Sequence, residues 1–328
     1  MKTAVVLFGF LRTFEKTANS LKKHIIEVND ADLFVFAPDR TGIICSLEEK
    51  IGNDDTKLGG IVSEARLREI YGDCLKACEL WQYDENIFQE EAEKYEIKTV
   101  ANINPVRIFS MFYHIKKSLQ LLQKYEENHN IKYDNIILTR PDLAFYSGVD
   151  IKGYDLGNIN VTKYRISLDN GAVVEAQAPV FYYKNAVKGI LISNHRYVFN
   201  DPIVISQHDN IMKLSSVYDR LSELIADRFP FNPESIIWYV LIYLNKLKLD
   251  LKPIEYEIFR ANMKEIENVS DLDVGCCLSK EKLRLYRFRM FVRLWLKLRY
   301  KYFNKPLYYQ KKAKLKCVEK EVRNNGVR

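Results

Sequence analysis

The sequence predicts an α/β fold built on a mostly parallel sheet with helices on both faces. Three observations predict this fold. The 328 residues are 47% hydrophobic and 28% charged, which is the composition of a chain that buries a large core, so disordered and collagen-like classes are excluded. Apolar runs alternate with amphipathic stretches over the first 140 residues, as in parallel sheets covered by helices. Between residues 158 and 208 the runs become shorter, as expected of an added antiparallel part.

The first half of the chain provides the parallel strands and their helices. We expect strands at residues 3–10, 32–37, 78–83 and 133–139. We expect helices at residues 14–28, 63–71 and 104–128, the last being the strongest because its apolar residues share one face and no Gly or Pro follows Pro105. Residues 41–60, rich in Gly, Asp and Lys, predict a loop.

The second half continues with shorter elements. We expect strands at residues 159–161, 172–176, 180–183, 203–206 and 249–259, and helices at residues 209–226 and 233–247. The longest apolar run away from the N-terminus covers residues 236–244, which is too short to span a bilayer. No internal repeat is visible, so one α/β domain followed by a tail is the predicted organisation.

The charge of the chain divides sharply along its length. The formal net charge of +7 combines about −7 over residues 1–278 with about +14 over residues 279–328. We therefore expect an α/β domain at 1–278 and a separate basic tail at 279–328. Such asymmetry indicates that the tail meets an anionic surface or a polyanion, while the body has another task.

Two loops should carry ligand-binding residues, because ligands of open α/β sheets bind beyond the carboxyl ends of the strands. The first loop, residues 9–13, contains Gly9 and Arg12, which suit close approach to the phosphate or base of a nucleotide. The second loop, residues 140–146, contains Arg140 and Asp142 directly after a buried strand. Plain structural roles are the alternatives: a tight turn for Gly9, a solvated side chain for Arg12, and an ion pair between Arg140 and Asp142 that stabilises the loop.

The order of these motifs resembles a known family. Phe8-Gly9-Phe10-Leu11-Arg12-Thr13 is followed by Asp32-Leu33-Phe34-Val35 and then by Arg140-Pro141-Asp142-Leu143, with weaker similarity at Asn200-Asp201-Pro202 and Pro233-Glu234. This order over roughly the first 150 residues resembles GT-A-type glycosyltransferases of bacterial capsule and lipopolysaccharide clusters. The resemblance implies a GT-A-like (Rossmann-like) sheet, a nucleotide-sugar donor, and a polysaccharide or lipid-linked acceptor.

The chain departs from that family at the motif that holds the metal. GT-A enzymes usually carry Asp-x-Asp at the end of this strand, and here Arg140 replaces the first carboxylate. Either Asp142 binds Mn²⁺ or Mg²⁺ with help from elsewhere, or Arg140 offsets the diphosphate charge directly through its fork of donors. The sequence leaves metal dependence open between these two possibilities.

Three further residues are candidates for the site. By the resemblance, Asp201 and Glu234 match positions that carry acidic residues and are the candidate catalytic groups, which would take the acceptor proton in an inverting reaction or stabilise an oxocarbenium-like state in a retaining one. Arg107, at the start of the helix at 104–128, is a weaker candidate for donor binding. Each has a structural alternative: capping of a turn before Pro202 for Asp201, the preference of acids for first helical turns for Glu234, and the polar character of helix starts for Arg107.

The basic tail has the pattern of a helix that lies in a membrane interface. Cationic residues recur at four-residue spacing beside an aromatic-rich face; the candidate membrane residues are Arg289, Arg293, Trp295, Lys297 and Lys301. We expect a location in the cytoplasm, peripheral on the inner face of the bacterial membrane. Docking of the tail on the acidic body is an alternative, and nucleic-acid binding is disfavoured because a phosphate-tracking segment does not need one apolar face.

The resemblance implies a glycosyltransferase, and the pattern of the tail predicts that it acts at a membrane surface. The alternatives are a phosphoryl- or sulfuryl-group transferase that modifies the same polysaccharide, and a non-catalytic membrane-associated assembly protein on the same fold. The missing Asp-x-Asp favours the last of these, and the two arginines fit the transfer of an anionic group.

Overall fold

A computed structural model describes the backbone of residues 1–42, 60–97, 104–162, 164–167, 173–176, 179–183, 191–227 and 229–259. Nearly all of these residues belong to one compact unit, Met1–Tyr164 with Glu175–Leu272, and the short segment Arg165–Val174 lies outside that unit.

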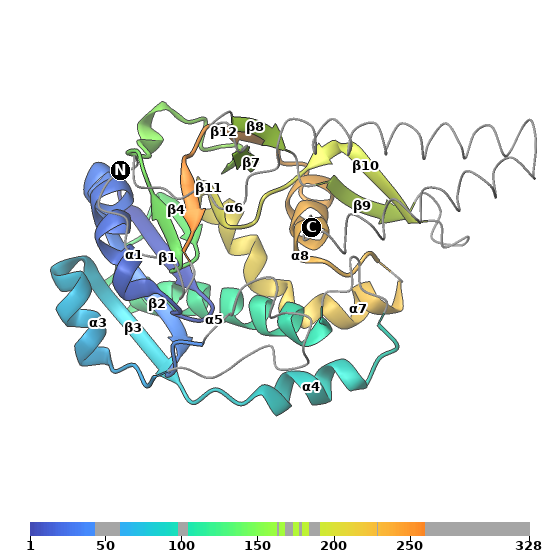
Figure 1. Ribbon diagram of the computed structural model, residues 1–328, viewed down its shortest axis with the longest axis horizontal. Coiled ribbons are helices and arrows are strands. Elements are labelled where there is room, and N and C mark those ends of the chain that lie inside the picture. Colours follow the sequence, from blue (N-terminus) through green and yellow to red (C-terminus); the bar gives the residue numbers. More distant parts are fainter. Residues whose placement is uncertain are drawn as a thin grey trace, which may run out of the picture. The chain divides into compact units, whose positions relative to one another are not determined.

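A seven-stranded mixed sheet forms the centre of this unit, with the strand order β12-β6-β11-β4-β1-β2-β3 (Figure 1). Its parallel part consists of β1 (Thr3–Phe8), β2 (Ala31–Pro38), β3 (Leu75–Trp81) and β4 (Asn135–Thr139). The side chains of β1 and β4 are buried along their whole length, as expected for strands covered on both faces.

The remaining strands extend the sheet beyond β4. Strand β11 (Ile203–Gln207) pairs antiparallel with β4 and with β6 (Ile159–Thr162), and β12 (Leu249–Lys252) pairs parallel with β6. The other strands of the described residues form two-stranded sheets: β5 (Leu143–Phe145) with β13 (Tyr256–Ile258), β7 (Tyr164–Ser167) with β8 (Val173–Ala176), and β9 (Pro179–Tyr183) with β10 (Leu191–Val198).

Helices cover both faces of the sheet (Figure 1). One face carries α4 (Glu85–Glu93), α5 (Pro105–His129), α6 (His208–Met212), η6 (Lys213–Ser216), η7 (Tyr218–Arg220), α7 (Leu221–Ala226), α8 (Pro233–Trp238) and η8 (Tyr239–Leu244). The other face carries α1 (Phe14–Leu21), which continues through η1 (Lys22–Ile26) into α2 (Glu27–Asn29), and α3 (Glu64–Tyr71), which is followed by η3 (Gly72–Cys74). A short turn, η5 (Ile151–Gly153), packs on this second face.

Strand β1 shows how the sequence builds the two cores. Val6 and Phe8 contribute to the core under α5, and Val5 and Leu7 contribute to the core under α1. Successive residues of a strand point to opposite faces of the sheet, and helices cover both faces, so all four side chains are buried. The uninterrupted apolar run at 3–8 is therefore the signature of a strand between two helical layers, and the predicted α/β class is confirmed.

The structure corrects several predicted element boundaries. The third strand covers residues 75–81 rather than 78–83, and α4 was missing from the predicted elements. The predicted helix at 209–226 is a series of short turns rather than one rod, and the predicted strand at 249–259 divides into β12 and β13 on either side of Pro253. Proline has no N–H to donate to a ladder, which explains the second break.

The basic tail at 279–328 and the candidate membrane residues in it lie outside the described residues. Within the described part of the chain, none of the helices combines the length and the apolar character that a bilayer crossing requires.

Candidate functional site

The loop after β1 adopts a special backbone at the two residues predicted to bind the donor. Gly9 has φ +89°, and Arg12 has φ +48°, a left-handed conformation that non-glycine residues seldom adopt. The Arg12 N–H donates to the carbonyl of Thr41, which helps to hold this conformation. Backbone strain of this kind persists only where the surroundings fix it, and it concentrates at functional sites.

Asp142 lies between two arginines that come from different strand ends. Arg140 donates from Nε to Oδ1 (2.9 Å) and from Nη2 to Oδ2 (2.7 Å), while Arg12 donates from Nη1 to Oδ2 (2.7 Å). The Asp142 side chain is 1% exposed, whereas those of Arg12 and Arg140 are 22% and 21% exposed. The ion pair weighed as an alternative for Arg140 is therefore present, and it extends to Arg12, 130 residues earlier.

Backbone and hydroxyl contacts fix the loop that carries Asp142. Thr17 Oγ1, in the first turn of α1, donates to the carbonyl of Pro141 (2.5 Å). The Phe259 N–H donates to the carbonyl of Asp142 (2.8 Å), and Thr13 Oγ1 donates to the carbonyl of Phe259 (2.9 Å). Through these contacts the loops after β1 and β4 and the end of β13 are hydrogen-bonded to one another at one edge of the sheet.

The charges around Asp142 favour its ionised form. Burial alone would raise the pKa of Asp142, but the positive charges of Arg140 and Arg12 outweigh burial and hold that pKa well below its ordinary range. For Arg140, burial acts to lower the pKa, and the charge and hydrogen bonds of Asp142 reverse the effect so that the pKa is raised. The cluster therefore carries two positive charges and one negative charge at neutral pH.

Asp201 lies at the same edge because β11 runs antiparallel to β4. Ile203 pairs with Thr139, and Thr139 Oγ1 donates to the carbonyl of Pro202 (3.1 Å), so the residues before β11 adjoin the end of β4. Burial is the main cause that raises the pKa of Asp201 to about 7; the negative charge of Glu234 adds to the rise, and Arg140 opposes it. Asp201 therefore lies within the electrostatic reach of both Arg140 and Glu234.

Glu234 occupies the first turn of α8, which begins at Pro233. Asn232, itself buried, donates from Nδ2 to Glu234 Oε2 (2.7 Å), which orients the carboxylate. The dipole of the helix also favours an acidic residue at this position. The structure thus brings together five of the predicted site residues at one edge of the sheet, through ion pairs or through the effect of one charge on another: Arg12, Arg140, Asp142, Asp201 and Glu234.

Gly9 lies in the same β1 loop, and Arg107 lies in the first turn of α5, where its N–H donates to the carbonyl of Asn104. The roles of Gly9 and Arg107 in donor binding stay predictions.

An aromatic cluster beside Arg12 did not emerge from the sequence. The ring of Phe10 packs edge-on against Tyr83, with 4.7 Å between centroids, and lies 6.0 Å from the ring of His114. Trp81 Nε1 donates to His114 Nε2 (3.3 Å), so His114 Nδ1 carries the proton and donates to the carbonyl of Ser110 (2.5 Å). These contacts support the β1 loop from the α5 side.

His114 is neutral at physiological pH. Burial is the main cause that lowers its pKa to about 4; the hydrogen bond to Ser110 opposes this shift, and the positive charge of Arg12 contributes to it. The sequence gives little indication that His114 supports the β1 loop, because His114 lies on the apolar face of a long helix among residues that pack in the core.

The carboxylate proposed as a metal ligand has little capacity left for a cation. Each oxygen of Asp142 already accepts at least one hydrogen bond from an arginine. Over the residues that the structure describes, no group of three or more His, Cys, Asp or Glu side chains could hold a metal ion. The donor set at this edge therefore does not fit a divalent cation.

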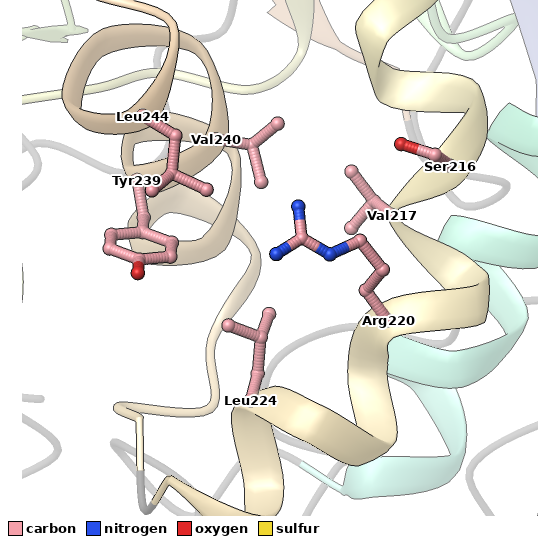
Figure 2. A pocket seen from close by; sticks show the side chains of 7 residues that line it. All are labelled: Ser216, Val217, Arg220, Leu224, Tyr239, Val240 and Leu244. Carbon is pink, nitrogen blue, oxygen red and sulfur yellow. The ribbon is translucent and has the colours of Figure 1, made fainter.

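A separate pocket lies between the segment from η6 to α7 on one side and η8 on the other (Figure 2). Figure 2 shows the guanidinium of Arg220 extending between the side chains of the two walls. The lining residues are Ser216, Val217, Arg220, Leu224, Tyr239, Val240 and Leu244. None of the predicted site residues lines this pocket.

Comparisons with known proteins return structures and no sequence family. No family model matches the chain, and no curated protein matches it. Among solved structures, the chain is similar to galactosyltransferase LgtC in complex with donor and acceptor sugar analogs (8% identity, TM-score 0.41, covering 75% of this chain and 72% of that one). It is also similar to mouse xyloside xylosyltransferase 1 (12% identity, TM-score 0.32, covering 76% and 84%).

A third similar structure is the bifunctional glycosyltransferase WbbM (14% identity, TM-score 0.35, covering 76% of this chain and 38% of that one). At these TM-scores the similarity by itself assigns no activity, and the functional argument depends on the residues of the site.

Proposed function

We propose that this chain is an enzyme, a nucleotide-sugar-dependent glycosyltransferase that transfers a sugar to a lipid-linked or surface-polysaccharide acceptor. The observation that carries the proposal is the meeting of two chemically distinct groups at one sheet edge: the arginine-flanked Asp142 and the acidic pair Asp201 and Glu234. A glycosyl transfer needs both, because it stabilises an anionic leaving group and removes a proton from an acceptor hydroxyl.

The arginine side of the site suits the donor. Arg12 and Arg140 present guanidinium groups at the carboxyl ends of β1 and β4, where ligands of open α/β sheets bind. Guanidinium groups match phosphate oxygens in geometry and charge. In the proposed reaction they contact the diphosphate of the donor.

The acidic side of the site suits the acceptor. A carboxylate with a pKa near the working pH is effective as a general base, and burial with the adjacent Glu234 brings Asp201 to that range. The acceptor hydroxyl attacks the anomeric carbon of the sugar, the bond from that carbon to the diphosphate breaks, and Asp201 takes the hydroxyl proton. Glu234 is the positioning partner that keeps the pKa of Asp201 raised.

A panel of donors tests the proposal directly. Purified full-length protein is expected to bind at least one nucleotide sugar or its nucleoside diphosphate and to hydrolyse the donor slowly without acceptor, measured by thermal shift and by release of nucleotide. Adenosine 3′-phosphate 5′-phosphosulfate and ATP serve as the comparison donors. A shift with these alone would indicate sulfuryl or phosphoryl transfer, and no response to any donor would contradict the proposed activity.

We further propose that the protein is located at the inner face of the bacterial membrane, and the basic sequence of residues 279–328 supports this location. Replacing Arg289, Arg293, Lys297 and Lys301 together by glutamine is expected to weaken binding to anionic vesicles roughly a thousandfold, since each cation contributes about 1 kcal/mol near such a surface. Vesicle co-sedimentation measures the loss, and neutral phosphatidylcholine vesicles provide the control. Equal binding of the two proteins to anionic vesicles would contradict a membrane role for the tail.

A further inference from the structure

We infer that Arg12 and Arg140, held together by Asp142, take the place of a divalent cation against the diphosphate of the donor. The inference rests on the proposed function and assigns the chemistry at its phosphate end. Of the two possibilities that the sequence leaves open for this loop, it selects the one in which arginine offsets the phosphate charge.

The first argument is the cost of recruiting Asp142 to a metal. A cation at this carboxylate would have to displace hydrogen bonds from two arginines, which are among the strongest that a protein forms. The incoming ion would then lie within a few ångströms of two guanidinium groups that have lost their counter-charge. Both effects oppose metal binding at Asp142.

The second argument is the direction in which the cluster faces. Asp142 is 1% exposed, whereas the side chains of Arg12 and Arg140 are each about one fifth exposed at 22% and 21%. The carboxylate is therefore the least exposed member of the cluster, and a ligand that arrives from solvent meets the arginine side chains first. A metal site requires the reverse order, with carboxylate oxygens toward the ligand.

The third argument is the balance of charge. Within the cluster itself, the two guanidinium groups and the carboxylate of Asp142 leave a single net positive charge. The pKa of Asp142 is held low, so this balance holds throughout the neutral range. When the bond between the sugar and the diphosphate breaks, the electron pair stays on the diphosphate oxygen, and this positive charge stabilises it.

Asp142 is consequently a positioning residue. Its two oxygens fix the Arg140 side chain through a bidentate contact and orient Arg12 from the other loop. Arg140 Nε and Nη2 make this contact, so Nη1 lies outside it. A lysine in place of Arg140 could supply the charge but could not make the same bidentate contact.

The test measures binding of the nucleoside diphosphate of the donor identified by the panel, by isothermal titration calorimetry with full-length protein. Titrations are run in EDTA, in Mg²⁺ and in Mn²⁺, and are repeated with the parent nucleoside. The variants are Arg140→Gln, Arg140→Lys and Arg12→Gln. Arg68→Gln is the matched control, because Arg68 is an exposed arginine of α3 paired with Glu64.

The expected result is a Kd in EDTA within about threefold of the Kd in either metal. Arg140→Gln and Arg12→Gln are each expected to weaken diphosphate binding by about tenfold to a hundredfold, as for the loss of a hydrogen bond between charged groups, while nucleoside binding changes little. Arg140→Lys should fall between the wild type and Arg140→Gln. Arg68→Gln should match the wild type.

Two outcomes overturn the inference and leave the proposed function standing: binding that is lost in EDTA and restored by Mn²⁺, or arginine variants that weaken nucleoside and diphosphate equally. A chain that binds no nucleotide under any condition, while circular dichroism shows it to be folded, overturns the proposed function and the inference with it.

Discussion

Replacing Asp142 by asparagine is expected to destabilise the protein by about 3–5 kcal/mol, the usual cost of removing one partner from a buried ion pair. The variant keeps the size of the side chain and leaves two guanidinium groups facing a neutral amide. Urea denaturation at pH 7 measures the change. Glu64→Gln is the control, since Glu64 and Arg68 form an exposed pair whose loss should cost less than about 1 kcal/mol.

The stability lost in Asp142→Asn should also depend on pH in a direction that can be worked out. A carboxyl group whose pKa is lowered by folding stabilises the fold fully above its ordinary pKa, 3.8 for Asp142, and loses that contribution as the pH falls toward the lower folded-state pKa. The stability difference between wild type and Asp142→Asn should therefore be constant near neutrality and shrink below about pH 4. A difference in unfolding free energy under about 1 kcal/mol at pH 7 would show that pairing of the two arginines with Asp142 contributes little to the stability of the fold.

Replacing Asp201 by asparagine is expected to lower kcat by about 100- to 10 000-fold, the contribution that general-base catalysis usually makes. The wild-type rate should rise with pH through about 7, because Asp201 accepts a proton only when it is ionised and its pKa is raised to about 7. The residual rate of the variant should lack this rise. Steady-state kinetics between pH 5 and pH 9 measure both effects.

Stability separates a catalytic loss from unfolding in this variant. A carboxyl group whose pKa is raised by folding destabilises the fold as the pH rises from its ordinary pKa toward the raised value. Asp201→Asn removes that penalty, so its Tm at pH 8 should equal or exceed that of the wild type. Glu234→Gln should shift the pH profile of kcat to lower pH, since Glu234 is one cause of the raised pKa. An active Asp201→Asn enzyme would exclude Asp201 as the base.

Much of the fold could be predicted because hydrophobic periodicity reflects burial directly. The run at 3–8 and the helix at 105–129 have a clear strand and helix pattern, and both lie where the sequence placed them. Strands β5 and β13 could not be predicted as a pair: each has three residues, too few for a periodic pattern, and they lie more than 100 residues apart. Helix α4 was missed because it buries only Phe88 and Ala92.

The candidate site was predictable at the level of position and not at the level of contacts. The carboxyl ends of β1 and β4 share an edge in any parallel pair, so Arg12 and Asp142 could be expected near each other. Nothing in the sequence indicates that Arg12 adopts a left-handed backbone, or that one carboxylate binds two arginines at once. Those features depend on side-chain rotamers and on loop conformation, which hydrophobic patterning does not report.

Phe259, the last residue that the structure describes, is hydrogen-bonded to the loop that holds Asp142 and to Thr13 at the start of α1. The last described residue therefore lies at the rim of the candidate site and not on the opposite side of the sheet. A force applied to Phe259 acts first on two hydrogen bonds, from the Phe259 N–H to the carbonyl of Asp142 and from Thr13 Oγ1 to the carbonyl of Phe259. Both of these bonds hold loops that carry the arginine cluster.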